Sequence, residues 1–245
     1  MNVKKIKTWR DPYETGFSTC RAREIEIKEG LTVLVGCNGS GKTTLIHNIR
    51  EILRKEDIPF IFYDNLHDGG GNAASSLFYN DEIGIAAALW TASEGECINI
   101  NMGVMSTKLR GFLQDGTYIK DKRSHALAQL FRSDDEKEKE VPDERWLLLD
   151  AVDSGLSIDN VIDLKGLFDL LIKESEKLGI ALYIVIAANE YELVNGSNCM
   201  DVTTGKYLQF KDYDDFRKFI IKSREKKDRR IENANRREAK KSSNN

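Results

Sequence analysis

The sequence is poor in the patterns that mark metal centres, disulfide frameworks and membrane spans. Its cysteines are scattered, with no C-x-x-C pair and no histidine at metal-ligand spacing: Cys20, Cys37, Cys97 and Cys199. This spacing argues against a zinc site or a disulfide framework. The apolar runs fall well short of a membrane span, and no apolar stretch follows the first lysines as in a secretory signal. We therefore expect a cytoplasmic protein without a membrane partner.

Charge is distributed unevenly along the chain. The net charge is −3, but the segment Lys222–Lys241 holds ten Lys or Arg residues against four acidic ones. Such a tail is able to hold nucleic-acid phosphates or to dock on an acidic protein. Glu225 and Arg229 stand at i, i+4 spacing and no aromatic residue is interleaved, which favours a solvated, fraying helix instead.

Apolar patterning predicts strands that alternate with helices. Alternating or continuous apolar runs predict strands at Arg21–Ile27, Leu31–Gly36, Pro59–Tyr63, Trp146–Leu149 and Ile180–Ala187. Helical spacing predicts helices at Thr43–Glu56, 82–92, from Gly95 to about 114, and at Val161–Leu178. A late hairpin strand is expected within Asp201–Phe210, and a helix from Asp212 whose apolar face stops at Ile221. This alternation indicates an α/β sheet.

One segment has the pattern of a phosphate-binding loop. The residues GCNGSGKT, 36–43, fit G-x-x-x-x-G-K-S/T between a buried strand and a helix. Glycines let backbone N–H groups turn toward a phosphate, Lys42 adds positive charge, and the Thr43 hydroxyl is suited to Mg²⁺. A glycine-rich turn without a ligand leaves this lysine unexplained. We predict ATP and Mg²⁺ as cofactors, held by Gly36, Asn38, Gly39, Ser40, Gly41, Lys42, Thr43 and Thr44.

A carboxylate follows a later apolar strand. The segment WLLLD ends at Asp150, where a P-loop protein needs an acidic side chain at the end of a neighbouring strand. The alternative is a surface aspartate at the end of an edge strand. We predict that Thr43 and Asp150 form the metal site.

Two further segments, in order with the P-loop and Asp150, resemble motifs of ABC-type ATPases. The residues DAVDSGLS, Asp150–Ser157, resemble the D-E-P-x-S-G-L-D passage that joins Walker B to the D-loop. The residues SEGE, Ser93–Glu96, resemble the S-S-G-E form of the signature motif in heads related to RecF and SMC proteins. The P-loop sequence CNGSGKTT is also typical of this group of ATPases. The resemblance covers residues 17–210, with 115–144 unmatched.

The resemblance implies a P-loop NTPase fold with an ABC-type ATPase core. That fold is α/β with a small helical lobe and an antiparallel N-terminal portion. We expect a domain at 1–215 with a charged insertion at 115–144, followed by a charged helical or disordered tail at 216–245. The distance in sequence from Lys42 to Ser93 leaves no room for a long coiled coil, so we expect a compact head.

The resemblance also implies an ATP-dependent homodimer. In that arrangement Ser93 and Gly95 contact the ATP held by the P-loop of a second copy, and Ser154 and Gly155 line the interface. The alternative is that SEGE is only a helix N-cap followed by acidic residues.

Three positions depart from the family pattern. The glutamate that acts as general base is replaced by Ala151, and the switch histidine falls on Asn189. The family's glutamine in the loop after the second strand is also missing, unless Asn65, His67 or Asp68 performs its function. Because transporter subunits usually need that glutamine, its absence favours a nucleic-acid-associated or defence-type role.

Loss of the general base predicts slow hydrolysis. A positioned base typically contributes ~10²–10⁴ in rate. Asp153 and Glu190 are the nearest spare carboxylates, and the predicted catalytic residues are Lys42, Asp150, Asp153 and Asn189.

The sequence is compatible with three functions. The first is an ATP-dependent switch protein with weak ATPase activity. The second is a P-loop kinase, a class that carries an arginine-rich lid. The charged segment 120–144 contains Arg123 and Arg132, but its acidity and the SGL sequence after Asp150 argue against such a lid. The third is a nucleotide-binding module that does not hydrolyse, which Ala151 favours.

Overall fold

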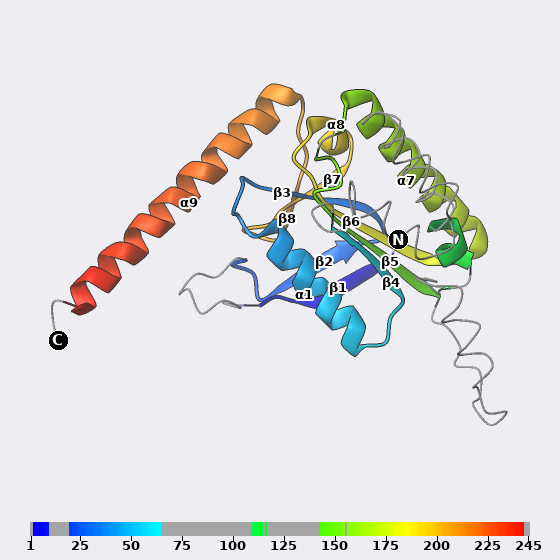
Figure 1. The fold of residues 1–245 in the computed structure, drawn as a ribbon, viewed down its shortest axis with the longest axis horizontal. Helices are drawn as coiled ribbons and strands as arrows, with labels where there is room; N and C mark the ends of the chain where they lie inside the picture. The colour runs from blue at the N-terminus through cyan, green and yellow to red at the C-terminus, as the bar shows by residue number, and fades with distance from the viewer. Residues whose placement is uncertain are drawn as a thin grey trace, which may run out of the picture.

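The chain is built around a six-stranded sheet. The computed structural model describes residues 2–9, 20–64, 109–114, 116, 143–154 and 156–242. The sheet has the strand order β4-β5-β6-β3-β7-β8, and β1 and β2 form a separate antiparallel pair (Figure 1). The strands are β1 (Val3–Lys7), β2 (Glu24–Lys28), β3 (Gly30–Val35), β4 (Phe60–Asp64), β5 (Glu144–Asp150), β6 (Ala181–Ala187), β7 (Asn198–Asp201) and β8 (Lys206–Leu208).

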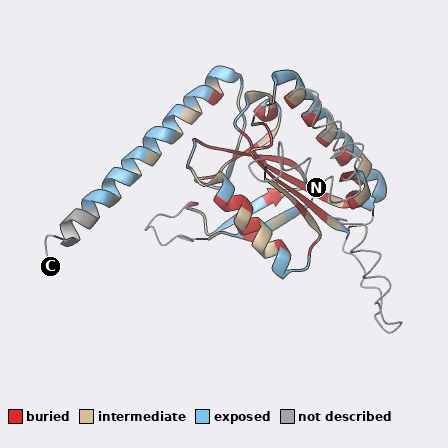
Figure 2. Ribbon diagram, in the orientation of Figure 1, coloured by how far each residue is buried: buried red, intermediate tan, exposed pale blue. Residues whose placement is uncertain are grey.

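Helices cover both faces of this sheet. The helices are α1 (Lys42–Lys55), α7 (Ile158–Leu178), α8 (Tyr191–Val194) and α9 (Tyr213–Ser242), and α1 and α7 pack on opposite faces. In β5, Trp146 and Leu148 belong to the apolar cluster that includes α1, whereas Leu147 and Leu149 belong to the cluster that includes α7. The central strands are buried on both sides (Figure 2), which explains their continuous apolar runs.

Five of the six strands run parallel. Strands β4, β5, β6, β3 and β7 pair in parallel, and only β8 is antiparallel to its neighbour β7. Their carboxyl ends therefore lie at one edge, as the pairing of Asp64 with Asp150 and of Asp150 with Ala187 illustrates. Open α/β sheets bind ligands outside this edge, which positions the candidate site.

The predicted α/β class and the antiparallel N-terminal portion are confirmed. The predicted strands and the helices at α1 and α7 are present, with ends shifted by a few residues. Strand β1 was not predicted, because only Ile6 in its sequence VKKIK is buried, opposite Ile25. Of the predicted helix from Gly95, residues 109–114 are helical; the helix at 82–92 and the insertion up to residue 142 lie outside the described residues.

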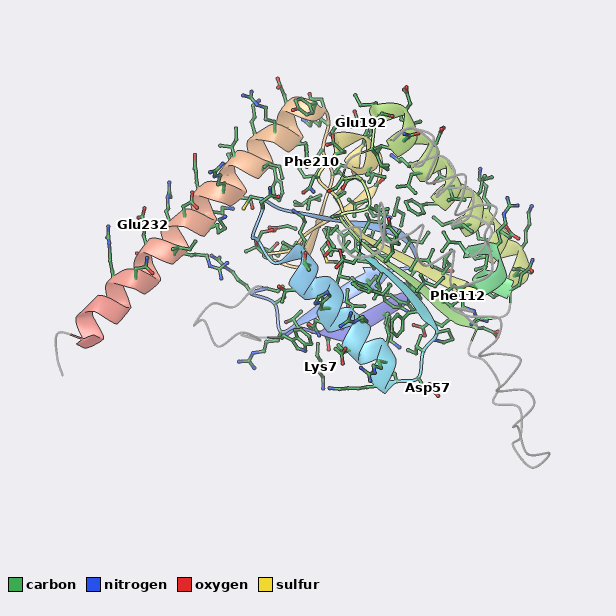
Figure 3. The ribbon with its side chains drawn as sticks, viewed as in Figure 1. Lys7, Asp57, Phe112, Glu192, Phe210 and Glu232 are labelled. Atoms are coloured by element: carbon green, nitrogen blue, oxygen red, sulfur yellow. The ribbon has the colours of Figure 1, made fainter. Side chains whose placement is uncertain are left out.

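The basic C-terminal segment is one helix of 30 residues, α9. Its first turns pack on the sheet domain, where Phe216 is only 6% exposed, so the expected boundary between 215 and 216 falls inside the helix. Phe210 lies near the junction with the body, whereas Glu232 lies on the part of α9 farther from the sheet (Figure 3). None of the described helices is long and apolar enough to cross a membrane.

Candidate phosphate-binding site

The loop between β3 and α1 has a backbone that favours glycine. Gly39 and Gly41 have φ angles of 71° and 102°, in the left-handed region. The Ser40 N–H donates to the Cys37 carbonyl at 3.0 Å and closes a tight turn. Helix α1 then begins at Lys42 without a side-chain cap and without an acidic residue in its first turn. Its first N–H groups and the positive end of its dipole therefore favour an anion.

The Lys42 ammonium lies against the same loop. Its Nζ donates a hydrogen bond to the Gly36 carbonyl at 2.9 Å, so the side chain folds back along the loop. Burial lowers the pKa of Lys42 from the ordinary lysine value, and three neighbours act in the opposite direction: Cys37, Asp153 and Asp150. Several anionic oxygens would stabilise this partly buried charge better than one carbonyl does.

Asp150 lies close to the start of α1. It ends β5 and is only 6% exposed. Burial raises the pKa of Asp150, and hydrogen bonding with the Thr43 side chain partly offsets that effect. A carboxylate and a hydroxyl at one place are oxygen ligands of the kind that Mg²⁺ takes.

The position of Asp150 in the sheet differs from the prediction in one respect. We expected it at the end of the strand beside β3, but β6 lies between β3 and β5. Asp150 therefore ends β5, which is separated from β3 by one strand. Thr43 nevertheless reaches it, because α1 starts at the same carboxyl edge and packs against β5.

A buried hydroxyl in the loop has no partner within the described part of the chain. This is Ser40 Oγ, and a Cβ added at Gly36 would lie 2.5 Å from it. An unpaired buried polar atom costs free energy, so a ligand oxygen beside Ser40 would be stabilising. The loop amides, Lys42 and Ser40 thus fit a phosphate group, and Thr43 with Asp150 fit its Mg²⁺.

A cavity of about 660 Å³ opens onto this loop, within the size range of small-molecule sites. Nine predicted site residues line it: Asn38, Gly39, Ser40, Gly41, Lys42, Thr43, Thr44, Asp150 and Asn189. Ala151 also lines it, with a left-handed φ of 51°. The structure thus brings the glycine-rich loop, the strand-end aspartate and Ala151 to one cavity.

Asp153 lies near Lys42 but does not form part of the cavity wall. It is 2% exposed and is not among the residues that line the cavity. Its Oδ2 accepts hydrogen bonds from the backbone N–H groups of Asn189 and Glu190, at 2.6 Å and 2.7 Å. The carboxylate therefore ties the segment after β5 to the segment after β6, directly before α8. This arrangement gives Asp153 a positioning role for Asn189.

Several residues of the sequence-based site lie outside the described residues. These are Ser93, Gly95, Gly155, Asn65, His67 and Asp68. Ser154 is described and exposed, and its N–H donates to the Ala151 carbonyl at 3.0 Å. The dimer contacts that the resemblance implies therefore stay predictions.

Sequence analysis did not single out part of the cavity wall. The additional lining residues include Arg21, Thr203, Thr204, Lys222, Lys226 and Arg230. The last three belong to α9. The sequence does contain a signal that α9 continues along the domain. The helix face that packs on the domain extends past Ile221, since steps of four, three and four residues connect Phe216, Ile220, Ser223 and Lys227.

Two solved structures illustrate what the chain is similar to in fold. A nucleotide-free ATP-binding cassette from an ABC transporter matches with 12% identity and a TM-score of 0.43, over 90% of this chain and 97% of that one. An ATP-binding cassette of an ABC transporter in its ADP conformation matches with 15% identity and a TM-score of 0.41, over 84% of this chain and 89% of that one. No protein-family model and no curated protein matches the sequence. The site must therefore be interpreted from its own residues.

Proposed function

We propose that this protein is an ATP-binding switch that dimerises on ATP with Mg²⁺ and hydrolyses it slowly. The observation that carries the proposal is the convergence of Lys42, Thr43 and Asp150 at one cavity beside a glycine-rich helix start. Those three groups supply a cation for phosphates and oxygen ligands for a metal. The ABC-type resemblance of the motifs supports the same assignment.

Each residue has a defined part in this proposal. The loop amides from Gly39 onward and the Lys42 ammonium would hold the phosphates. Thr43 and Asp150 would hold Mg²⁺, which when bound neutralises phosphate charge. Asn189, fixed through its N–H by Asp153, faces the same cavity and would contact the phosphate end of the nucleotide.

Slow hydrolysis follows from the cavity wall. The position after Asp150 is Ala151, which lines the cavity and has no proton acceptor. Asp153, the nearest spare carboxylate, already accepts two backbone hydrogen bonds. Without a positioned base the rate falls by ~10²–10⁴, so bound ATP would act chiefly as a dimerisation ligand.

The dimer is RecF/SMC-like in this proposal and has no coiled coil. Ser93 and Gly95 of one copy would meet the ATP of the other. The output would be a nucleic acid or an acidic protein, bound by the basic segment Lys222–Lys241.

The first test is nucleotide binding by wild type and Lys42→Ala, measured by calorimetry with ATP and Mg²⁺. We expect binding in wild type and none in the variant; equal affinity in both would overturn the P-loop assignment. The Asp150→Asn variant should fold, but its affinity for ATP should no longer depend on Mg²⁺.

Light scattering of wild type with ATP and Mg²⁺ should give the mass of a dimer. A monomer at every ATP concentration would reject the proposed switch.

Single-turnover assays with labelled ATP separate the remaining functions. Slow phosphate release supports the switch. Bound ATP that is never hydrolysed supports a nucleotide-binding module, which Ala151 in the cavity wall favours. Transfer of the label to a small acceptor would support a kinase and overturn the proposal.

A further inference from the structure

The basic helix α9 lies on the phosphate-binding loop. The Cys37 N–H donates to Ser223 Oγ at 3.3 Å, and Lys227 Nζ donates to the Asn38 carbonyl at 2.8 Å. A Cβ added at Gly39 would lie 3.5 Å from Lys227 Nζ. Two successive turns of the helix therefore contact the loop that begins the candidate site.

The side chains of α9 explain this docking. Phe216 is buried in the main apolar cluster, and Ile220 packs against that cluster. Ser223 and Lys227 continue the same face at spacings that a helix places in line. The apolar anchor fixes the direction of the helix, and the two polar residues pair with main-chain groups of the loop.

A second row of side chains on α9 faces the cavity. Lys222, Lys226 and Arg230 stand four residues apart and all line the cavity that also contains Lys42 and Asp150. At a rise of about 1.5 Å per residue, each step moves about 6 Å along the helix. The row therefore contributes to the cavity wall over about two turns of the helix.

The cavity wall carries an excess of positive charge. Six Lys or Arg side chains line it, against two carboxylates. In the part of the chain that the structure describes, neither Lys222 nor Lys226 forms an ion pair. Like charges gathered around a concave surface attract an anion and are stabilised by it. The P-loop at the base of the cavity already favours phosphate, so the row enlarges the same anion site.

We propose that α9 is the second wall of the nucleotide site, and that Lys222 and Lys226 bind the phosphates of ATP held by the P-loop of the same chain. The inference rests on the proposed function and goes beyond it, because it assigns to the tail a nucleotide contact. ATP and the docked helix then stabilise one another, since coupling between two binding events is reciprocal.

The test compares ATP affinities at about 0.15 M salt, where exposed charges are screened beyond about 8 Å. The test variant is the double substitution Lys222→Ala and Lys226→Ala. The matched control is Arg229→Ala, an exposed cation of the same helix that pairs with Glu225 and does not line the cavity. A double Lys→Arg variant keeps the charge.

We expect the double alanine variant to bind ATP at least about tenfold more weakly than wild type, because two charged contacts to the phosphates are lost. Arg229→Ala and the arginine variant should stay within about twofold of wild type. Wild-type affinity in the double alanine variant would overturn this inference while leaving the P-loop assignment intact. Failure of wild type itself to bind ATP would instead overturn the proposed function.

Hydrogen exchange supplies a second readout that does not depend on affinity. ATP should slow exchange in peptides from 213–231 of wild type, and less so in the double alanine variant at saturating ATP. Equal protection by ATP in the two proteins would contradict the contact. If single-stranded nucleic acid, and not ATP, distinguishes the two proteins, the row belongs to a nucleic-acid site and the inference is wrong.

Discussion

The Lys227 ammonium donates a hydrogen bond to the main-chain carbonyl of Asn38, 189 residues earlier in the chain. With the contact between Ser223 and Cys37, it fastens the C-terminal helix to the loop that precedes α1. A ligand in that loop and the position of α9 therefore cannot vary independently.

Lys227→Ala should loosen α9 without unfolding the domain. The lost hydrogen bond is exposed to solvent, so we expect less than about 1 kcal/mol of destabilisation. Exchange of amide hydrogens should become faster in peptides beyond residue 223, because Phe216 still anchors the first turns. Arg229→Ala is the control and should leave exchange in that region unchanged. Equal exchange in the two variants would contradict a docking role for Lys227.

Ala151→Glu should raise ATP turnover at least about tenfold, because it restores a carboxylate at the cavity wall beside Asp150. Ala151 already has a φ of 51°, so the larger side chain adds little backbone strain. Steady-state phosphate release measures the effect, with Ala151→Gln as the control that cannot accept a proton. Equal rates in the glutamate and glutamine variants would show that no base acts from this position.

Asp153→Ala should destabilise the fold by about 3 kcal/mol, because two backbone N–H groups lose a buried acceptor. Asp153→Asn keeps one carbonyl oxygen and should cost clearly less. Urea unfolding measures both values. If alanine is tolerated as well as asparagine, the carboxylate does not position Asn189 in the way the hydrogen bonds indicate.

Gly205→Ala should be more harmful than Gly196→Ala. Both glycines have left-handed φ angles, 68° and 71°, so both variants pay about 1 kcal/mol for the backbone. Only at Gly205 would the new Cβ meet another group, Ile25 Cγ2 at 2.5 Å, whereas nothing lies within 4 Å at Gly196. Thermal unfolding should therefore separate the two by about 1–3 kcal/mol. Equal melting temperatures would mean that the turn moves away from β2.

Much of the site could be predicted because its signals are local. The sequence GCNGSGKT combines the glycines that a left-handed loop needs with the lysine that follows it, and the structure places Lys42 at the first position of α1. The run WLLLD predicted a strand that ends in a carboxylate, and Asp150 is the last residue of β5. Neither inference needed knowledge of distant contacts.

Other features could not be predicted, because they depend on which strands become neighbours. Periodicity does not reveal that β6 lies between β3 and β5. It also does not reveal that Asp153 accepts hydrogen bonds from Asn189 and Glu190 and so becomes a main-chain acceptor behind the cavity. Strand order is decided by the packing of whole helices on the two faces of the sheet.

The α/β pattern, the glycine-rich loop and the aspartate at a strand end follow from steric and periodic rules that act over a few residues, so local sequence is enough to specify them. The position of the basic tail depends instead on contacts between distant segments. Burial of Phe216 against the sheet domain aims a charged helix across the P-loop, so that Ser223 and Lys227 meet main-chain groups nearly two hundred residues away. Charge patterning alone carries no such direction.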